Sequence, residues 1–499
     1  MTIAMDICYY DLGVIKIKER LMVQHLRNFI DNDKDYQIAL VSGIRRTGKT
    51  TILRQLQGYY PEAAYIDLSS AKDGYAEIEN RFLFPENRPN LLLLDEITYL
   101  DNYELISQSL YDLPGKNYKI IMTGSSSAHV IKLSESKLGG GRSKLFRLPL
   151  LTFIEYLYFT DKIKSYDDYQ SVKNEYFSDY LQLKGLEDTN ANKLAVMFND
   201  NYFQSFYNEN LTSNLNTHII YSKVKLGRDD LDSLLNLIAY KLSEACEYEK
   251  IIRPDAGKQE QFNLARQKIR LQLTKIDISD AIVSVSSGRV VKLATNDKGR
   301  ILQYLLSSGL AYIQYIDNSP DFSPMNNGLS VGDILNILSN CKKESELIRL
   351  FDRLTINIVS PLFYTRLGGD IIKRANISLD FLLKDVLLGK MLELYMTGSL
   401  LNWSDNSILT STKLLYPEIG EVDIYDKKNL VLLEAATHNK KSNEIHLSEY
   451  FKAGNYIRVC SSKDKDAFNG QYYQIPYAKL CCMIDTGDIF KLNRTVTSD

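Results

Sequence analysis

Short apolar runs alternate with amphipathic segments between residues 37 and 150, and this alternation is the clearest pattern in the chain. Each run has the length of one strand, and the segments between the runs carry apolar residues at helical spacing. Strands that alternate with helices are typical of a parallel sheet covered on both faces. The pattern therefore predicts an α/β fold with the strands Gln37–Ser42, Ala64–Leu68, Leu91–Leu94, Tyr118–Thr123 and Lys144–Leu148.

The pattern becomes helical after residue 150. From about Phe153 to Arg270 the apolar positions recur at helical spacing with few turn signals, and this favours a helical lid. Many tyrosines of the chain fall in this region, and two interpretations remain open for them. They are either half-buried packing residues of the helices or a surface on which rings stack. Four examples are Tyr156, Tyr166, Tyr169 and Tyr180.

Residues 271–316 have the element order of a winged helix. Two short helical segments are followed by Gly309, which ends the second helix, and by the strand Ala311–Ile316. Lys298 and Arg300 lie near the start of the second helix, where a winged helix contacts nucleic acid. The alternative is a winged helix that packs against a neighbouring domain of the chain and does not contact DNA.

Composition narrows the class of protein. A chain of 499 residues is too long for one core, and its net charge of −2 means that binding to nucleic acid would need local basic patches. Its six cysteines form no C-x-x-C pair, so reduced thiols are expected. No apolar run approaches the ~18 residues of a membrane span. We therefore expect a cytoplasmic protein that does not enter a membrane.

A glycine-rich loop follows the first predicted strand. Residues 43–50 read GIRRTGKT, which matches the phosphate-loop pattern G-x-x-x-x-G-K-[ST] between a strand and a helix. Lys49 would contact the β- and γ-phosphates, and the Thr50 hydroxyl would bind Mg²⁺. ATP and Mg²⁺ are the expected ligands. The predicted nucleotide-binding residues of the loop are Gly43, Arg46, Thr47, Gly48, Lys49, Thr50 and Thr51.

Polar side chains follow the next strands of the predicted sheet. Asp95 and Glu96 end a buried strand, so Asp95 is predicted to hold Mg²⁺ and Glu96 to act as general base on the attacking water. Thr123 and Ser125 end another strand and are predicted sensors of the γ-phosphate. Arg142 follows three glycines and is predicted to neutralise transferred charge, in its own or a neighbouring subunit; a surface arginine without this role is the alternative.

In this order these motifs resemble a prokaryotic AAA-type (P-loop) ATPase family with a C-terminal PD-(D/E)XK-like domain of unknown function. The resemblance includes Gly141–Arg142 and the run from Leu148 to Tyr156. It implies an AAA-type parallel sheet followed by a helical lid, a winged helix and an α/β nuclease-like domain. The expected divisions are a leader (1–25), the ATPase core (26–156), the helical lid (157–270), a winged-helix-like module (271–318), a helical connector (319–357) and the PD-(D/E)XK-like domain (358–490).

Three acids of the last region fall where a PD-(D/E)XK core would place them. Glu393 lies on a predicted helix, Asp423 on a strand, and Glu434 at the end of an apolar strand. Together they would form a second metal site. The lysine expected two residues after the last acid is replaced by Ala436, so cleavage should be slow or absent. Three side chains that could take its place are His438, Lys440 and Lys441.

Two functions of different class follow from these motifs. The first is an ATP-hydrolysing switch or machine that acts on DNA or on a protein partner. The second is an ATP-gated, metal-dependent DNA nuclease, for example in defence. A scaffold that binds ATP without appreciable hydrolysis is a third option, which the acidic pair at residues 95 and 96 argues against. A homo-oligomer is compatible with all three, because a neighbour could supply an arginine.

Overall fold

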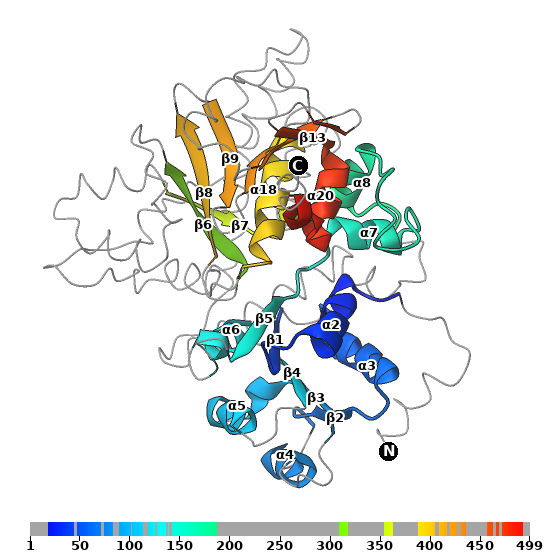
Figure 1. The fold of residues 1–499 in the computed structure, drawn as a ribbon, viewed down its shortest axis with the longest axis vertical. Helices are drawn as coiled ribbons and strands as arrows, with labels where there is room; N and C mark the ends of the chain where they lie inside the picture. Colours follow the sequence, from blue (N-terminus) through cyan, green and yellow to red (C-terminus); the bar gives the residue numbers. More distant parts are fainter. Residues whose placement is uncertain are drawn as a thin grey trace, which may run out of the picture.

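The computed structural model of the 499-residue chain describes part of its length. The described residues are 18–43, 47–70, 74–82, 89–100, 102–112, 118–124, 127–135, 138, 142–186, 309–317, 354–362, 388–404, 409–416, 420–426, 431–435, 457–462, 466–468 and 472–492. They form two sheets with helices around them, one in the N-terminal part of the chain and one in the C-terminal part (Figure 1).

The N-terminal sheet has five parallel strands in the order β2-β3-β4-β1-β5. All five strands predicted from the sequence are present. The strand β4 lies between β1, which precedes the glycine-rich loop, and β3, which ends in the two acids. The strands are β1 (Ile38–Ser42), β2 (Ala64–Asp67), β3 (Leu91–Asp95), β4 (Lys119–Thr123) and β5 (Ser143–Arg147).

Helices cover both faces of this sheet because its strands are apolar on both sides. Along β1, Ile38 and Leu40 belong to one buried cluster, whereas Ala39 and Val41 belong to another. The second cluster includes residues of α2 and α3, and the first includes residues of α4, α5 and α6. Buried strands without an exposed face are characteristic of parallel sheets. The helical segments are α2 (Leu21–Asn32), α3 (Lys49–Tyr59), α4 (Gly74–Phe82), η2 (Ile97–Tyr99), α5 (Tyr103–Tyr111) and α6 (Ser127–Glu135).

The C-terminal sheet has eight strands in the order β12-β13-β11-β10-β9-β8-β6-β7 and is mixed. Parallel pairs join β10 to β11, β11 to β13, and β6 to β8, and the other pairs are antiparallel. The strands are β6 (Ala311–Asp317), β7 (Leu354–Ile358), β8 (Leu409–Tyr416), β9 (Gly420–Asp426), β10 (Val431–Glu434), β11 (Ile457–Ser462), β12 (Ala467–Phe468) and β13 (Tyr472–Pro476). Two helices, α18 (Leu388–Leu401) and α20 (Tyr477–Thr486), pack against this sheet, and η7 (Asp488–Lys491) follows α20.

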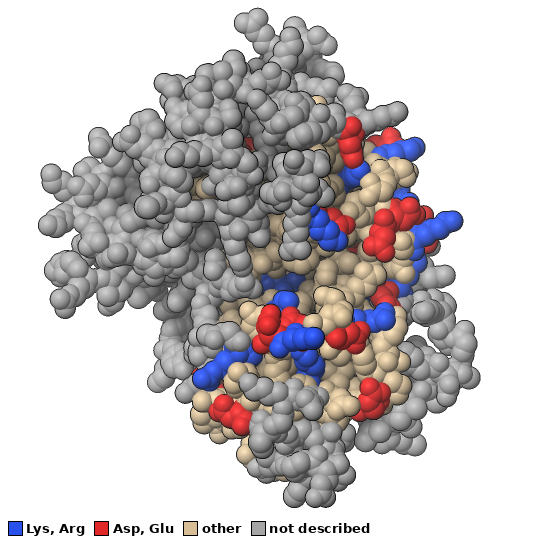
Figure 2. Space-filling model, viewed as in Figure 1, with Lys and Arg blue, Asp and Glu red and all other residues tan. Residues whose placement is uncertain are grey.

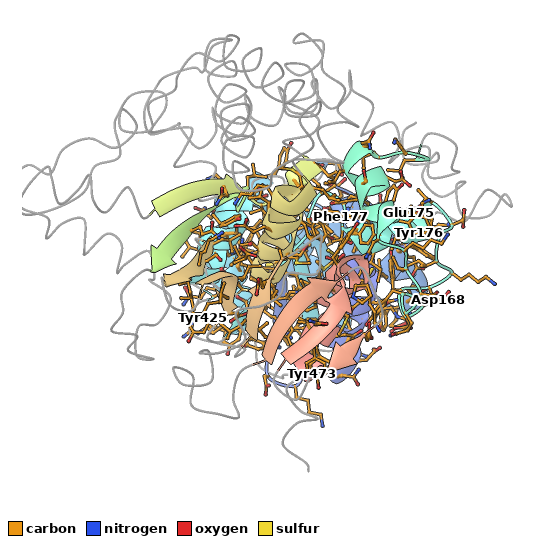
Figure 3. All side chains as sticks on the ribbon, turned by 90° about the horizontal axis from the view of Figure 1, so that it is seen from above. Asp168, Glu175, Tyr176, Phe177, Tyr425 and Tyr473 are labelled. Carbon is orange, nitrogen blue, oxygen red and sulfur yellow. The ribbon has the colours of Figure 1, made fainter. Side chains whose placement is uncertain are left out.

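Two short helices after the first sheet pack against the C-terminal helices. They are α7 (Phe153–Phe159) and α8 (Glu175–Gln182), and both contact α20 (Figure 1). Phe177 of α8, labelled in Figure 3, lies 5.3 Å from Tyr395 of α18 between ring centroids. The described start of the predicted helical lid is thus helical, but it joins the C-terminal domain. The four tyrosines noted in the sequence are all buried, which confirms packing over a stacking surface.

Two predicted divisions differ from the structure. The leader was expected to end at residue 25, but α2 begins at Leu21 and its residues Val23 and Leu26 are fully buried. The strand Ala311–Asp317 exists, but it pairs with β7 and β8 in the C-terminal sheet, and not within a wing. Sequence alternation predicts a strand without naming its partner. The predicted helices of the winged helix, with Lys298 and Arg300, lie outside the described residues.

Charge is dispersed over the described surface seen in Figure 2. Lysines and arginines lie among aspartates and glutamates there, and the described part of this face has no extended basic area. This view therefore gives no support for a nucleic-acid surface in the described residues. Within the same described ranges, no helix is both long enough and apolar enough to cross a membrane.

Candidate functional site: a phosphate loop beside an acidic strand end

The glycine-rich loop joins β1 to α3 at the carboxyl end of the sheet. Gly48 stands directly before α3 with φ of 95°, a left-handed conformation that glycine adopts without strain. Lys49 is the first residue of α3 and is buried, and its ammonium group donates a hydrogen bond to the Gly43 carbonyl oxygen over 2.7 Å. The lysine is therefore directed back across the loop, where a phosphate group would lie.

The other glycine of the motif is required by close packing. A Cβ atom at Gly43 would lie 3.0 Å from both the Cβ and the carbonyl oxygen of Leu148. It would also lie 3.2 Å from the Thr47 hydroxyl oxygen. Any larger residue would push the loop away from the segment that follows β5. Both motif glycines thus have a structural reason, one in the backbone conformation before α3 and one in the close approach of Leu148.

Asp95 lies at the end of β3 and is held by two hydroxyl groups. Thr123, at the end of β4, donates its hydroxyl to one carboxylate oxygen, and Tyr65 of β2 donates to the other over 3.0 Å. Asp95 is only 1% exposed. Burial and the negative charge of Asp95 raise the pKa of Tyr65, so this hydroxyl stays protonated. The two hydroxyls fix the orientation of the carboxylate that would face a magnesium ion.

Glu96 adopts a left-handed backbone conformation, with φ of 60° and ψ of 42°. Its backbone N–H lies 3.4 Å from the Thr123 hydroxyl oxygen, to which it donates. A non-glycine residue in this region is uncommon and is often associated with a functional position. Asp95 is buried whereas Glu96 is partly exposed, so the two acids have separate environments.

Arg142 lies at the opposite edge of the sheet from the loop. In the parallel pairing of β1 with β5, Ser143 is level with Ile38 and Arg147 is level with Ser42. Arg142 is thus about 16 Å of extended backbone from the loop edge. Its guanidinium lies 5.4 Å from the ring centre of Tyr111. The structure does not bring Arg142 to the site of its own chain, so only its predicted role toward a neighbouring copy stays a prediction.

Some of the remaining predicted residues of this site belong to the described part of the chain, and others do not. Thr47 is buried, whereas Thr50 and Thr51 are exposed in the first turn of α3. Arg46 and Ser125 lie outside the described residues. Sequence reasoning missed Tyr65, which only the pairing of β2 with β3 brings to Asp95. No motif spacing would have identified it.

A five-stranded parallel sheet, with a glycine-rich loop after β1 and acids after β3, defines a P-loop nucleoside-triphosphate-binding domain. The strand β4 lies between these two strands in the sheet. Residues 35–157 match the model of a family described as an AAA domain. The match supports an AAA-type domain in this part of the chain, with a nucleotide-binding, ATPase-like function.

The chain is also similar to an uncharacterized protein of Methanocaldococcus jannaschii. The two are 29% identical over 266 residues, which cover 46% of this chain and 54% of the archaeal protein. The matched region is thus about half the length of that relative. The similarity agrees with a prokaryotic AAA-type protein and adds no activity or partner.

In the C-terminal domain, a lysine forms ion pairs with two of the three predicted acids. Lys413 of β8 lies 3.2 Å from a carboxylate oxygen of Glu393 and 3.1 Å from one of Asp423. The other oxygen of Asp423 accepts a hydrogen bond from the backbone N–H of Ala435 over 2.7 Å. Continuing the register of β9 and β10 places Asp423 opposite Glu434. All three acids are buried.

This arrangement differs from the predicted second metal site. Within the described ranges, no group of three or more His, Cys, Asp or Glu side chains could hold a metal ion. Burial by itself would raise the pKa of Glu393, but Lys390 and Lys413 lower it below the usual value. The candidates Ala436, His438, Lys440 and Lys441 lie outside the described residues. Sequence reasoning missed Lys413, because it lies between Glu393 and Asp423 in the chain, and the lysine was expected after Glu434.

Proposed function

We propose that the protein binds and hydrolyses ATP with Mg²⁺ and acts as a nucleotide-driven switch on DNA or on a protein partner. The observation that carries the proposal is the pair of hydrogen bonds made by Thr123. This hydroxyl accepts from the backbone of Glu96 and donates to Asp95. The tip of β4 thereby links the acid that would hold Mg²⁺ to the acid that would activate water.

The residues present are suited to ATP and Mg²⁺. The loop offers the backbone amides after Gly48 and the ammonium group of Lys49, both suited to phosphate oxygens. The hydroxyl of Thr50 and the carboxylate of Asp95 are oxygen ligands of the kind that Mg²⁺ prefers. Glu96, partly exposed beside Asp95, would take the proton of the attacking water. When bound, Mg²⁺ would neutralise charge on the phosphates.

Phosphate release by purified variants tests this proposal. Lys49→Ala should lose ATP binding, and Glu96→Gln should bind ATP but lose at least about 100-fold in turnover, the usual effect of removing a general base. Lys34→Ala and Glu62→Gln change exposed residues of the same types and should behave as wild type. Unchanged phosphate release in Lys49→Ala and Glu96→Gln would refute the assignment.

A second candidate is an ATP-gated, metal-dependent DNA nuclease, whose metal ion would need ligands beyond the described residues. Lys413 favours it, because this lysine places a cation beside Glu393 and Asp423. The lysine that the nuclease pattern expects is replaced by Ala436, and Lys413 could take its role. Incubation of the full chain with DNA, ATP and either Mg²⁺ or Mn²⁺ is the test. Cleavage that disappears in Asp423→Ala and persists in Asp426→Ala, on the same strand, would support the nuclease. Absence of cleavage with both metals would remove it.

A further inference from the structure

A buried arginine outside the phosphate-loop motif contacts the loop directly. Arg20 stands directly before α2 and is 4% exposed. Its Nη1 donates a hydrogen bond to the Thr47 carbonyl oxygen over 2.8 Å, and its Nη2 donates to the Pro149 carbonyl oxygen over 2.9 Å. One guanidinium therefore joins the loop to the segment that leaves the AAA sheet.

The contact with Thr47 fixes an amide group of the loop. The Thr47 carbonyl and the Gly48 N–H belong to one planar trans peptide unit, so the two groups point in opposite directions. An arginine that holds the carbonyl on one side therefore directs the Gly48 N–H to the other side. Gly48 is the residue before α3, where backbone amides of a phosphate loop face the ligand. Arg20 is thus placed to orient the Gly48 N–H through the Thr47 carbonyl, without contacting a phosphate itself.

The same arginine is tied to Glu155 at the start of α7. Nε and Nη2 of Arg20 donate to the two carboxylate oxygens of Glu155 over 2.7 and 2.8 Å. Glu155 also accepts from the backbone N–H groups of Thr152 and Leu21. Burial by itself would raise the pKa of Glu155, but the charge of Arg20 and these hydrogen bonds lower it, so the carboxylate stays ionised. The pair is a bidentate ion pair in the interior, which has one favourable geometry.

The C-terminal domain holds the other side of α7. The backbone N–H of Phe153 donates to the hydroxyl of Tyr395, and that of Ile154 donates to Asp485 over 3.2 Å. Tyr395 itself donates to Asp485. The ring of Phe153 also packs at 5.4 Å from that of Phe177, which contacts Tyr395. A displacement of α7 would therefore be transmitted to α18 and α20.

We propose that Arg20 is a positioning residue that couples the phosphate loop to the C-terminal domain, through Glu155 and the start of α7. The proposal rests on the proposed function, since it assumes that nucleotide binds the loop. When phosphates draw the loop amides toward them, the Thr47 carbonyl moves relative to Arg20. The bidentate pair transmits this displacement to Glu155, and α7 carries it to Tyr395 and Asp485.

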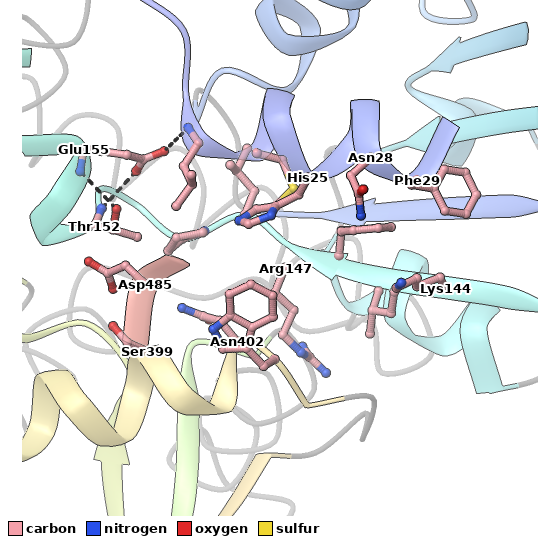
Figure 4. Close-up of a pocket in the computed structure, with 17 residues that line it drawn as sticks. His25, Asn28, Phe29, Lys144, Arg147, Thr152, Glu155, Ser399, Asn402 and Asp485 are labelled. Carbon is pink, nitrogen blue, oxygen red and sulfur yellow. Dashed lines mark hydrogen bonds between the residues drawn. The ribbon is translucent and has the colours of Figure 1, made fainter. Parts of the chain in front are cut away.

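A cavity beside this path leaves room for such a movement. It measures about 180 Å³ and lies between α2 and β5 on one side and α18 and α20 on the other (Figure 4). Glu155 and Asp485 line it, together with His25 of α2 and Trp403 after α18. Close-packed interiors resist displacement, whereas a cavity at a domain boundary permits it. Hydrogen bonds therefore join the two domains at α7, whereas the cavity separates them beside it.

The single tryptophan of the chain reports on this boundary. Trp403 lies edge-on to His25, with 5.1 Å between ring centroids, and its indole N–H donates to the Ile484 carbonyl oxygen over 2.9 Å. His25 belongs to α2, which packs on the N-terminal sheet, and Ile484 belongs to α20 of the C-terminal domain. A shift between the domains changes the surroundings of the indole and so its fluorescence. Trp403→Phe confirms that the signal comes from this residue.

The test uses the full-length chain titrated with Mg²⁺–ATP and with a non-hydrolysable ATP analogue. Glu155→Gln keeps an oxygen for the helix cap but presents an NH₂ group to one arm of Arg20, so the bidentate pair is broken. We expect the Kd for nucleotide, measured by equilibrium dialysis, to rise by no more than about threefold, while the Trp403 response falls to less than about half of wild type. The matched control Glu175→Gln changes a glutamate whose side chain is 69% exposed on α8, and it should keep the full response (Figure 3).

The outcomes separate the coupling from the ATPase assignment. A full Trp403 response in Glu155→Gln, or a wild type that binds nucleotide without any response, would overturn the coupling alone. A folded wild type that binds no nucleotide would overturn the proposed function and the coupling together. If circular dichroism shows that Glu155→Gln does not fold, Arg20→Lys replaces it. Lysine keeps a positive charge beside Glu155 but cannot reach all three partners, so the same loss of response is expected.

Discussion

Thr123 donates its hydroxyl to the carboxylate of Asp95 and accepts a hydrogen bond from the backbone of Glu96. This hydroxyl joins the tips of two neighbouring strands, β3 and β4. A residue that contacts both acids senses any change in either, such as the arrival of a cation at Asp95. The relationship explains why the order of the strands, and not the motifs alone, determines what the site can do.

The strained backbone at Glu96 predicts that replacing this residue raises the stability of the fold and lowers its activity. A left-handed conformation costs a non-glycine residue about 1 to 2 kcal/mol, and asparagine tolerates it better than glutamate. Glu96→Asn should therefore raise the free energy of unfolding by up to about 1 kcal/mol and abolish turnover. Urea unfolding and phosphate release measure the two effects. Glu96→Gln removes the same charge without this backbone preference, so a similar gain in its stability would contradict the explanation.

The close approach of α18 to the strand end at Val359 predicts a large effect of one methyl group. A Cβ atom at Gly398 would lie 2.0 Å from the Val359 carbonyl oxygen, so backbone would have to move. Gly398→Ala should lower the free energy of unfolding by about 3 kcal/mol or more, as overpacking against a rigid neighbour does.

Gly389→Ala is the matched control on the same helix. Nothing lies within 4 Å of a Cβ atom there, so alanine should be neutral or should stabilise by up to about 1 kcal/mol. Chemical denaturation compares the two variants. Equal effects would show that α18 does not lie as close to Val359 as the structure places it.

Lys413 predicts a dependence of stability on its ammonium group. Lys413→Met leaves the Glu393 and Asp423 carboxylates without the cation between them, and breaking a buried ion pair costs about 3 to 5 kcal/mol. Lys390→Met should cost less, because its side chain is 33% exposed and water replaces part of the interaction. The folded-state pKa of Glu393 is lowered, so the stability it contributes is present at neutral pH and is lost as the pH falls through that value. The cost of Lys413→Met, measured by urea unfolding, should therefore shrink on acidification.

Two groups that line the interdomain cavity predict opposite effects of pH. Burial lowers the pKa of His25 to about 4, so the folded state binds fewer protons there, and stability falls as the pH drops from 6.5 to about 4. Burial also raises the pKa of Asp485 to about 7, although Tyr395 and Ile154 donate to it. Stability contributed by this group falls as the pH rises from 3.8 to about 7. The two slopes largely cancel in the wild type.

Asp485→Asn should reveal the slope that belongs to His25. Its asparagine oxygen can still accept from the backbone of α7, but the variant no longer titrates. The free energy of unfolding should then rise by on the order of 3 kcal/mol between pH 4 and pH 6.5, as a pKa lowered from 6.5 to about 4 requires. Urea unfolding at several pH values measures it. A pH profile no steeper in the variant than in the wild type would contradict the assignment.

Patterns local in sequence predicted the AAA domain well. The five apolar runs became the five strands, and both glycines of the loop proved necessary for reasons that their motif implies. These successes depend on spacing along the chain, which is what a sequence displays directly.

Contacts between distant segments could not be predicted in the same way. Arg20 and Glu155 are separated by 135 positions, and nothing in the local sequence around either residue points to the other. Lys413 lies before two of its acids in the chain, so a search after Glu434 could not find it. The three glycines before Arg142 suggest a role at the phosphate loop, but the direction of β5 places Arg142 at the end of the sheet opposite its own chain's loop. Each case depends on how strands pair, which periodicity does not determine.

The parallel pairing of β6 with β8 determines where the chain can be truncated without exposing a strand edge. A truncated polypeptide that starts at residue 358, as the domain divisions drawn from the sequence suggest, would lack both β6 and β7. The peptide groups of β8 that β6 satisfies would then be open to solvent, and an open strand edge recruits other chains. Expression of the isolated tail should thus yield insoluble material, whereas recombinant fragments that begin before residue 309 retain both strands.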